Sequence, residues 1–301
     1  MKKQPVPLKA GDRIGLVATA RAIEPSEISY ALSVLNEWGY EPVLAPHLFE
    51  RNNQFAGTDA QRAADLQAFL EDDQVHAILC VRGGYGTIRT LTPLLDKSFA
   101  QPKWVIGFSD VTVLHTFLQQ QQNWQSVHGP MAFSFKPNEE ATRAAKSLHN
   151  LLNGQAPTIE APGHVFNIAG EATAELVGGN LSVIYSTMGT PFEVDTRGKI
   201  LFLEDLDEYL YHIDRMMMNL KTANKLAGLK GIVVGGMTDM NDNTTPFGKQ
   251  AEEIIQEHTR ELDIPIGYNL PCGHMDENMP LLLGAQYTLK VTKEGSILQP
   301  T

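Results

Sequence analysis

The first half of the chain alternates short apolar stretches with longer stretches of helical spacing, and this alternation limits the possible folds. Strands are expected at residues 13–18, 42–44, 75–81 and 103–106. Helices are expected at 25–38 and after a capping-box pattern at 58–61. Two more are expected, one from the end of the segment 82–86 to about residue 95 and one at 111–122. The stretch 75–81 is apolar almost throughout, as a strand covered on both faces requires. Repeated units of this kind predict an α/β fold with a parallel sheet and helices on both sides.

The second half has a more mixed pattern and begins after a further expected helix at 139–152. The segment 154–163 is rich in proline and glycine, which is typical of a linker. We therefore predict a domain at 1–153, a linker at 154–164 and a second domain at 165–301. The second domain is expected to hold a Gly-Gly turn at 178–180, strands at 200–203 and 231–234, helices at 209–221 and 247–262, and several short β segments over 265–298.

Composition and charge exclude several classes of partner. The chain has 301 residues and a formal net charge of −11, without a basic run or stripe. Nucleic acid and anionic membrane surfaces are therefore not expected as partners. No apolar stretch has the form of a signal peptide or a membrane span. Two cysteines cannot form a disulfide framework, so a reducing cytoplasm is the expected compartment.

The strongest chemical feature is Ser109, which follows the strand 103–106 and precedes the helix 111–122. Such a tight turn lifts a hydroxyl clear of the sheet and directs the first free N–H groups of the helix at the bond that the hydroxyl attacks. The turn thus offers a nucleophile and part of an oxyanion hole. Serine is also a good helix N-cap, and the local sequence G-x-S-D lacks the second glycine of the usual hydrolase turn.

The glycine loop, residues 82–86, follows the strand 75–81 at the edge of the sheet where open α/β folds bind ligands. Glycines at this edge allow the backbone to approach a substrate closely. If the two strands are neighbours, the N–H of Gly84 faces the N–H of Asp110 across a substrate carbonyl. The loop has the form of neither a phosphate loop nor a dinucleotide fingerprint, and a plain tight turn is the alternative.

Two further segments carry candidate catalytic side chains. Glu204 and Asp205 end the strand 200–203, where a carboxylate can orient a histidine, although a solvated acidic turn is the alternative. His274 lies in a loop beside Cys272, and no tight turn surrounds that cysteine as a nucleophile requires. The spacing of His274, Asp276 and Glu277 matches no strong metal motif, so no metal and no cofactor are predicted.

Several motifs, in order and over nearly the whole chain, resemble the LD-carboxypeptidase family, the serine peptidases of bacterial peptidoglycan recycling. The segments that carry the resemblance are 55–58, 81–86, 107–110, 128–131, 178–181, 203–208, 215–216 and 273–274. One departure is Ala18-Thr19-Ala20-Arg21, where many members have Pro and Ser.

This resemblance implies a catalytic triad of Ser109, His274 and Glu204. It implies an N-terminal domain like those of class I glutamine amidotransferases and a smaller C-terminal mixed β/α domain of the swivelling type. It further implies a cytoplasmic homodimer that needs no metal and removes the terminal D-alanine from an L,D-linked peptidoglycan tetrapeptide.

A carboxypeptidase must also bind a free carboxylate, and arginine does this best through paired N–H donors. Arg82 and Arg215 are candidates from their positions beside matched motifs, and each also suits a structural ion pair. Gly83, Tyr85 and Asn180 are further candidates for substrate binding. Two alternatives remain, a microcin C-type resistance peptidase of the same superfamily and a catalytically silent peptide-binding protein.

Overall fold

The computed structural model describes residues 2–301 and divides them into two compact units. The first unit runs up to Ala156 and includes the later segment Asp276–Gly284, and the second comprises Pro157–Met275 and Ala285–Thr301. These bounds differ from the predicted domains, because 276–284 belongs to the first unit. The expected linker also contains strand β6 (Ile159–Pro162), which pairs with the last strand of the chain.

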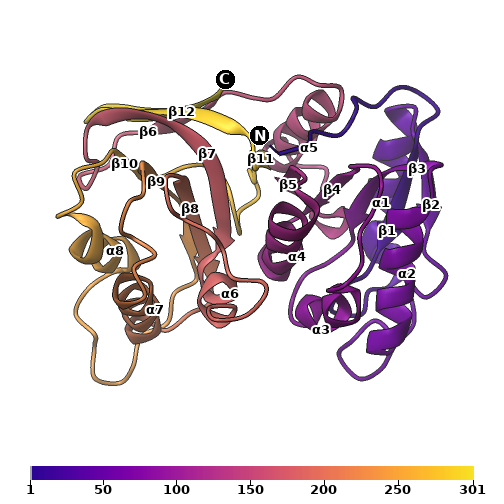
Figure 1. The fold of residues 1–301 in the computed structure, drawn as a ribbon, viewed down its shortest axis with the longest axis horizontal. Helices are drawn as coiled ribbons and strands as arrows, with labels where there is room; N and C mark the ends of the chain where they lie inside the picture. The colour runs from indigo at the N-terminus through magenta and orange to yellow at the C-terminus, as the bar shows by residue number, and fades with distance from the viewer. Residues whose placement is uncertain (1) are drawn as a thin grey trace. The chain divides into compact units, whose positions relative to one another are not determined.

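The first unit is built on a six-stranded sheet in the order β11-β5-β4-β3-β1-β2 (Figure 1). All neighbouring pairs are parallel except β11 with β5. The strands are β1 (Arg13–Val17), β2 (Glu41–Leu44), β3 (Val75–Cys80), β4 (Trp104–Gly107), β5 (Ser126–His128) and β11 (Leu281–Leu283). The predicted parallel sheet is therefore confirmed, with an antiparallel strand added at one edge.

The helices of the first unit follow the expected alternation closely. They are α1 (Pro25–Glu37), α2 (Asp59–Glu71), α3 (Thr87–Leu91), α4 (Thr112–Phe117) and α5 (Glu139–Leu152). The capping box at the start of α2 is present, because the Thr58 and Gln61 side chains each accept from the other's backbone N–H. The helix expected at 111–122 is one continuous run of three types, with a 3₁₀ turn before α4 and a π-helical turn after it.

The second unit is smaller and has a seven-stranded mixed sheet in the order β10-β9-β8-β7-β12-β13-β6. The pairs from β10 to β7 are parallel, and the remaining pairs are antiparallel. Its other strands are β7 (Gly170–Asn180), β8 (Ile200–Leu206), β9 (Gly231–Thr238), β10 (Ile266–Gly267), β12 (Gln286–Val291) and β13 (Gly295–Pro300). Helices α6 (Leu181–Ser186), α7 (Leu210–Thr222) and α8 (Ala251–Thr259) share one apolar core with β8 and β9.

Two expected local features of the second unit are corrected. Gly178 and Gly179 lie inside β7 instead of forming a turn. A Cβ on Gly178 would lie 2.0 Å from the Phe202 carbonyl oxygen of β8, so a larger residue would not fit there. The glycines therefore allow two strands to approach closely. Glu204 and Asp205 also lie inside β8, which is longer than predicted. Leu201 and Leu203 belong to the core under the helices, so strand alternation directs Glu204 to the opposite face.

Candidate active site

The turn at Ser109 has the strained backbone that a nucleophile turn requires. The φ angle of Ser109 is 63°, in the left-handed region that non-glycine residues seldom adopt. The residue is half-buried, between the end of β4 at Gly107 and the 3₁₀ turn that leads into α4. Such strain persists only where the surrounding structure holds it in place.

A buried histidine that the sequence analysis missed anchors this turn. His115 on α4 donates from Nε2 to the Gly107 carbonyl oxygen at 2.9 Å, since that oxygen can only accept. Its Nδ1 then accepts from the Ser126 hydroxyl at 3.0 Å. Burial lowers the pKa of His115 to about 4, so the ring is neutral at physiological pH. The only sequence signal was a histidine between Leu114 and Phe117, two of the apolar residues of this helical stretch.

The glycine loop packs directly against the serine. A Cβ on Gly83 would lie 3.1 Å from the Ser109 Cβ and 3.3 Å from its Oγ, so only glycine fits without displacing the hydroxyl. Gly84 has a φ angle of 114°. Within residues 2–301, the N–H groups of Gly84 and Asp110 donate to no protein acceptor and are free to bind a substrate oxygen. Tyr85 is exposed and its ring packs 6.2 Å from that of Phe55.

Asp110 ties the glycine loop to the Ser109 turn through its side chain. The buried carboxylate accepts the backbone N–H of Thr87, the first residue of α3, at 2.8 Å. Burial raises the pKa of Asp110 above the usual carboxyl value, against the backbone hydrogen bonds of Thr87 and Gly86 that lower it. The residue after Ser109 thus fixes the end of the loop that precedes α3.

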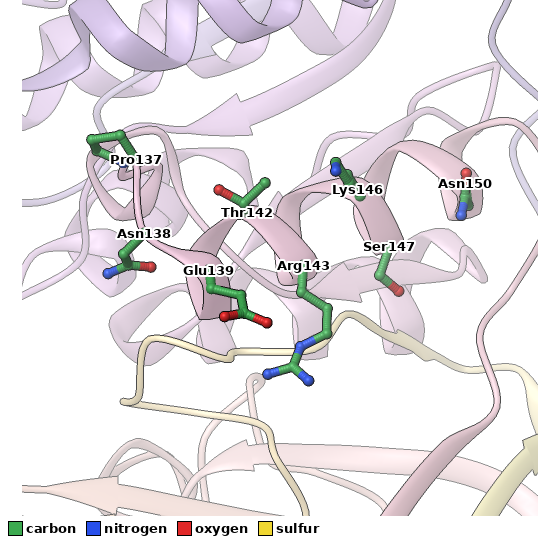
Figure 2. Close-up of a pocket in the computed structure, with 8 residues that line it drawn as sticks. All are labelled: Pro137, Asn138, Glu139, Thr142, Arg143, Lys146, Ser147 and Asn150. Carbon is green, nitrogen blue, oxygen red and sulfur yellow. The ribbon is translucent and has the colours of Figure 1, made fainter.

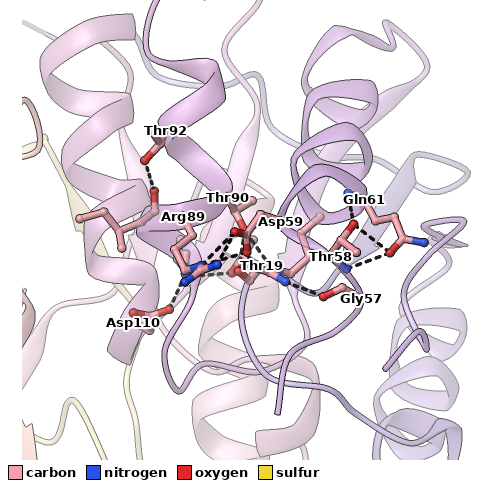
Figure 3. A network of polar contacts seen from close by, with 12 residues as sticks. Thr19, Gly57, Thr58, Asp59, Gln61, Arg89, Thr90, Thr92 and Asp110 are labelled. Atoms are coloured by element: carbon pink, nitrogen blue, oxygen red, sulfur yellow. Dashed lines mark hydrogen bonds and ion pairs between the residues drawn. The ribbon is translucent and has the colours of Figure 1, made fainter. Parts of the chain in front are cut away.

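A polar network continues from this point to the start of α2 (Figure 3). The Thr87 hydroxyl bonds that of Thr19 at 2.9 Å, and Thr90 donates to the Thr19 carbonyl at 2.9 Å. The fully buried Arg62 donates to Thr90 at 3.0 Å and pairs with Asp59, which also takes two N–H donors from Arg89. Hydrogen bonds and ion pairs therefore hold together the loop after β1, the start of α2 and α3, which follows the glycine loop.

In the second unit, Glu204 and His274 form a close pair. Nδ1 of His274 lies 2.6 Å from Oε2 of Glu204, which also accepts the backbone N–H of His274 at 3.2 Å. Glu204 is fully buried. Gly273, with a φ angle of 107°, makes room for the carboxylate, because a Cβ there would lie 2.7 Å from Oε2. The arrangement fixes the ring and leaves Nε2 as the atom that can accept a proton.

The electrostatics of this pair suit a general base. Burial lowers the pKa of His274, but the hydrogen bond to Glu204 and the charges of Glu204 and Asp205 together raise it above the ordinary histidine value. Asp205 is itself buried, and desolvation together with the charge of Glu204 raises its pKa to about 7. It accepts from the Asn180 side chain at 2.8 Å and from the Ser182 backbone at 2.9 Å.

The remaining predicted substrate residues have other contacts in the structure. Arg82 pairs with Glu27 at 2.9 Å and lies over the Phe133 ring. Arg215 is exposed on α7 and lies over the Tyr211 ring. The Asn180 side chain caps α6 by accepting the Val183 N–H at 3.1 Å. These contacts give each residue a structural role.

A hollow of the first unit contains none of the predicted site residues (Figure 2). It runs along α5 and the turn before it, with Asn138, Glu139, Arg143 and Asn150 among its lining side chains. Within residues 2–301, no group of three or more His, Cys, Asp or Glu side chains is placed to hold a metal ion. The same residues include no helix long and apolar enough to cross a membrane.

Comparisons with known proteins identify the family of this chain. The LD-carboxypeptidase N-terminal domain matches residues 14–129, and the LD-carboxypeptidase C-terminal domain matches residues 173–289. A probable murein peptide carboxypeptidase of Bacillus subtilis is 33% identical, with 98% of this chain and 94% of that protein covered.

Solved structures give the same result. The muramoyltetrapeptide carboxypeptidase of Oxalobacter formigenes is 25% identical with a TM-score of 0.84, over 96% of this chain and 98% of that one. A microcin C7 self-immunity protein shares the fold, with a TM-score of 0.86 at 19% identity over 99% and 98% of the two chains. The chain is therefore an enzyme of the LD-carboxypeptidase family and contains both of the domains that define it.

Proposed function

We propose that this enzyme is a serine carboxypeptidase that releases the terminal D-alanine from L,D-linked peptidoglycan tetrapeptides. The single observation that carries the proposal is the left-handed backbone of Ser109 between β4 and the following helix. The name of the Bacillus subtilis relative, a murein peptide carboxypeptidase, supports the substrate class. The name of the Oxalobacter formigenes structure supports a tetrapeptide.

In the proposed mechanism, Ser109, His274 and Glu204 act as a triad. Nε2 of His274 takes the hydroxyl proton while Ser109 Oγ bonds to the carbonyl carbon of the L-centre. The C–N bond then breaks, and the same proton passes to the leaving amine of D-alanine. Water, deprotonated by His274, next hydrolyses the acyl-enzyme and restores the serine. Glu204 holds the tautomer of the ring and stabilises its protonated form.

The N–H groups of Asp110 and Gly84 are proposed to stabilise the oxyanion. Losing one such donor typically costs about 3 kcal/mol of transition-state stabilisation. Both groups are free of protein acceptors within residues 2–301 and lie next to Ser109 and Gly83 in the chain. Roles for Arg82, Arg215, Gly83, Tyr85 and Asn180 in substrate binding remain predictions, as do the cytoplasmic location and the homodimer.

Mass spectrometry of purified muropeptides tests the proposal directly. We expect the enzyme to remove one D-alanine from the tetrapeptide and to leave pentapeptide and tripeptide unchanged. Ser109→Ala should abolish turnover and leave the circular dichroism spectrum unchanged. Full activity in that variant would refute the mechanism. Cleavage of a peptidyl-nucleotide, with the tetrapeptide intact, would assign the enzyme to the microcin-resistance role instead.

A further inference from the structure

The loop after β1 contains Ala18-Thr19-Ala20-Arg21, where the sequence departs from the family pattern, and it lies at the edge of the first sheet where ligands bind in open α/β folds. Strand β1 pairs with β2 on one side and with β3 on the other. The direction in which successive strands are added to the sheet therefore reverses, and the reversal lies between β1 and β3. Open α/β sheets bind ligands outside the carboxyl ends of the strands at such a point. Arg21 follows β1 there, the glycine loop follows β3, and Ser109 follows the next strand, β4.

Arg21 is in direct contact with the glycine loop. A Cβ on Gly84 would lie 2.2 Å from Cδ and 2.4 Å from Cγ of Arg21, so the arginine stem occupies the space that a side chain on Gly84 would fill. The Arg21 backbone N–H also donates to the Gly83 carbonyl at 3.4 Å. Because a Cβ on Gly83 would lie 3.3 Å from the Ser109 Oγ, the glycine loop adjoins both this arginine and the serine.

The Arg21 side chain is exposed. Every other arginine of the first unit pairs with a carboxylate within 4.0 Å; these are Arg13, Arg51, Arg62, Arg82, Arg89 and Arg143. Within residues 2–301, Arg21 makes no ion pair and no side-chain hydrogen bond. In a chain with a net charge of −11, an unpaired arginine at a ligand edge is available for an anion from outside.

We propose that Arg21 binds the free carboxylate at the end of the peptide substrate and so makes the enzyme specific for a terminal residue. The inference rests on the proposed carboxypeptidase function. That carboxylate is one carbon beyond the amine of the scissile bond, so its receptor must lie close to Ser109. Arginine can hold both oxygens through parallel N–H donors, which a lysine cannot reproduce. Arg82 is the weaker candidate because Glu27 already neutralises it.

The test compares a tetrapeptide with its C-terminal amide. Arg21→Met keeps the stem over Gly84 and removes only the charged group. We expect the kcat/KM of this variant on the acid to fall roughly 10- to 100-fold, which is the effect of losing one charge-assisted hydrogen-bonded pair. Its activity on the amide should not change. Arg51→Met, which removes an exposed arginine paired with Glu24, is the matched control and should change neither substrate.

Equal losses on both substrates would overturn the proposal, as would a preference for the acid that disappears in Arg82→Met and persists in Arg21→Met. Calorimetry separates this inference from the proposed function. In the Ser109→Ala background, the acid should bind more tightly than the amide, and Arg21→Met should remove the difference. That result supports the carboxylate site even if the native enzyme cleaves no tetrapeptide, and the absence of any difference rejects it.

Discussion

The Ser109 turn and the Glu204–His274 pair position reactive groups by different physical means. At the turn, the backbone holds the serine in a left-handed conformation, and Gly83 leaves space for its hydroxyl. In the pair, a fully buried carboxylate in the middle of β8 holds an imidazole through one short hydrogen bond. The turn therefore depends on conformation and the pair on charge, so the two regions should respond differently to the same kinds of substitution.

The two histidines illustrate this difference. His115 is completely buried beneath the turn, contacts only neutral groups through its ring nitrogens, and has its pKa lowered to about 4 by desolvation. His274 faces Glu204, whose hydrogen bond and charge outweigh the desolvation and raise its pKa. A single carboxylate thus separates a histidine whose pKa is lowered by burial from one whose pKa is raised.

The largest expected effect comes from removing that carboxylate charge. Glu204→Gln should lower kcat by about 10⁴-fold, because the amide favours the wrong tautomer and no longer stabilises the imidazolium. The base works only when neutral, so activity rises with pH through the His274 pKa, and loss of the negative charge lowers that pKa. The acid limb of the kcat/KM profile should therefore move to lower pH. An unmoved limb would contradict the role of Glu204.

The second prediction concerns the stability of the Ser109 turn in acid. The folded-state pKa of His115 is depressed to about 4 from 6.5, so its stabilising contribution is complete above pH 6.5 and is lost as the pH falls through 4. This loss is on the order of 3 kcal/mol. Urea unfolding at several pH values should show a shallower acid decline for His115→Gln, which keeps a donor and an acceptor but cannot titrate. Identical slopes would show that the buried ring does not control acid stability.

The smallest expected effect tests the backbone strain at Ser109. Glycine adopts a φ angle of 63° without steric cost, whereas alanine does not. Ser109→Gly should therefore be more stable than Ser109→Ala by about 1 kcal/mol, although neither variant has a nucleophile. Thermal unfolding of the two variants measures the difference. Equal stability would mean that the turn is not strained in solution.

The local features of the fold were predictable because local patterns determine them. The capping box before α2, the helix Glu139–Leu152 and the strands before the glycine loop and Ser109 all follow from nearby residues. The chain order of Ser109, Glu204 and His274 was also visible, and the pairing of the last two is present in the structure.

The missed features depend on partners that are distant in sequence. The sequence around Gly178 suggests a turn, because nothing in it reveals that Phe202 of the neighbouring strand passes beside this glycine. His115 looked like an ordinary helical residue, since its two hydrogen-bond partners, the Gly107 carbonyl and the Ser126 hydroxyl, meet only when β4 and β5 pair. The ion-pair partner of Arg82 and, among residues 2–301, the lack of one for Arg21 were equally hidden, because ion pairs form between elements that are distant in sequence.

The late segment Asp276–Gly284 has a consequence for how the protein is made. Its strand β11 covers the edge of β5 in the first unit, yet it is translated after most of the second unit. While the nascent chain emerges from the ribosome, Ser126–His128 therefore remain an open edge that can pair with other chains. The first unit is completed only near the end of synthesis, so a truncated product would lack the strand that protects it from aggregation.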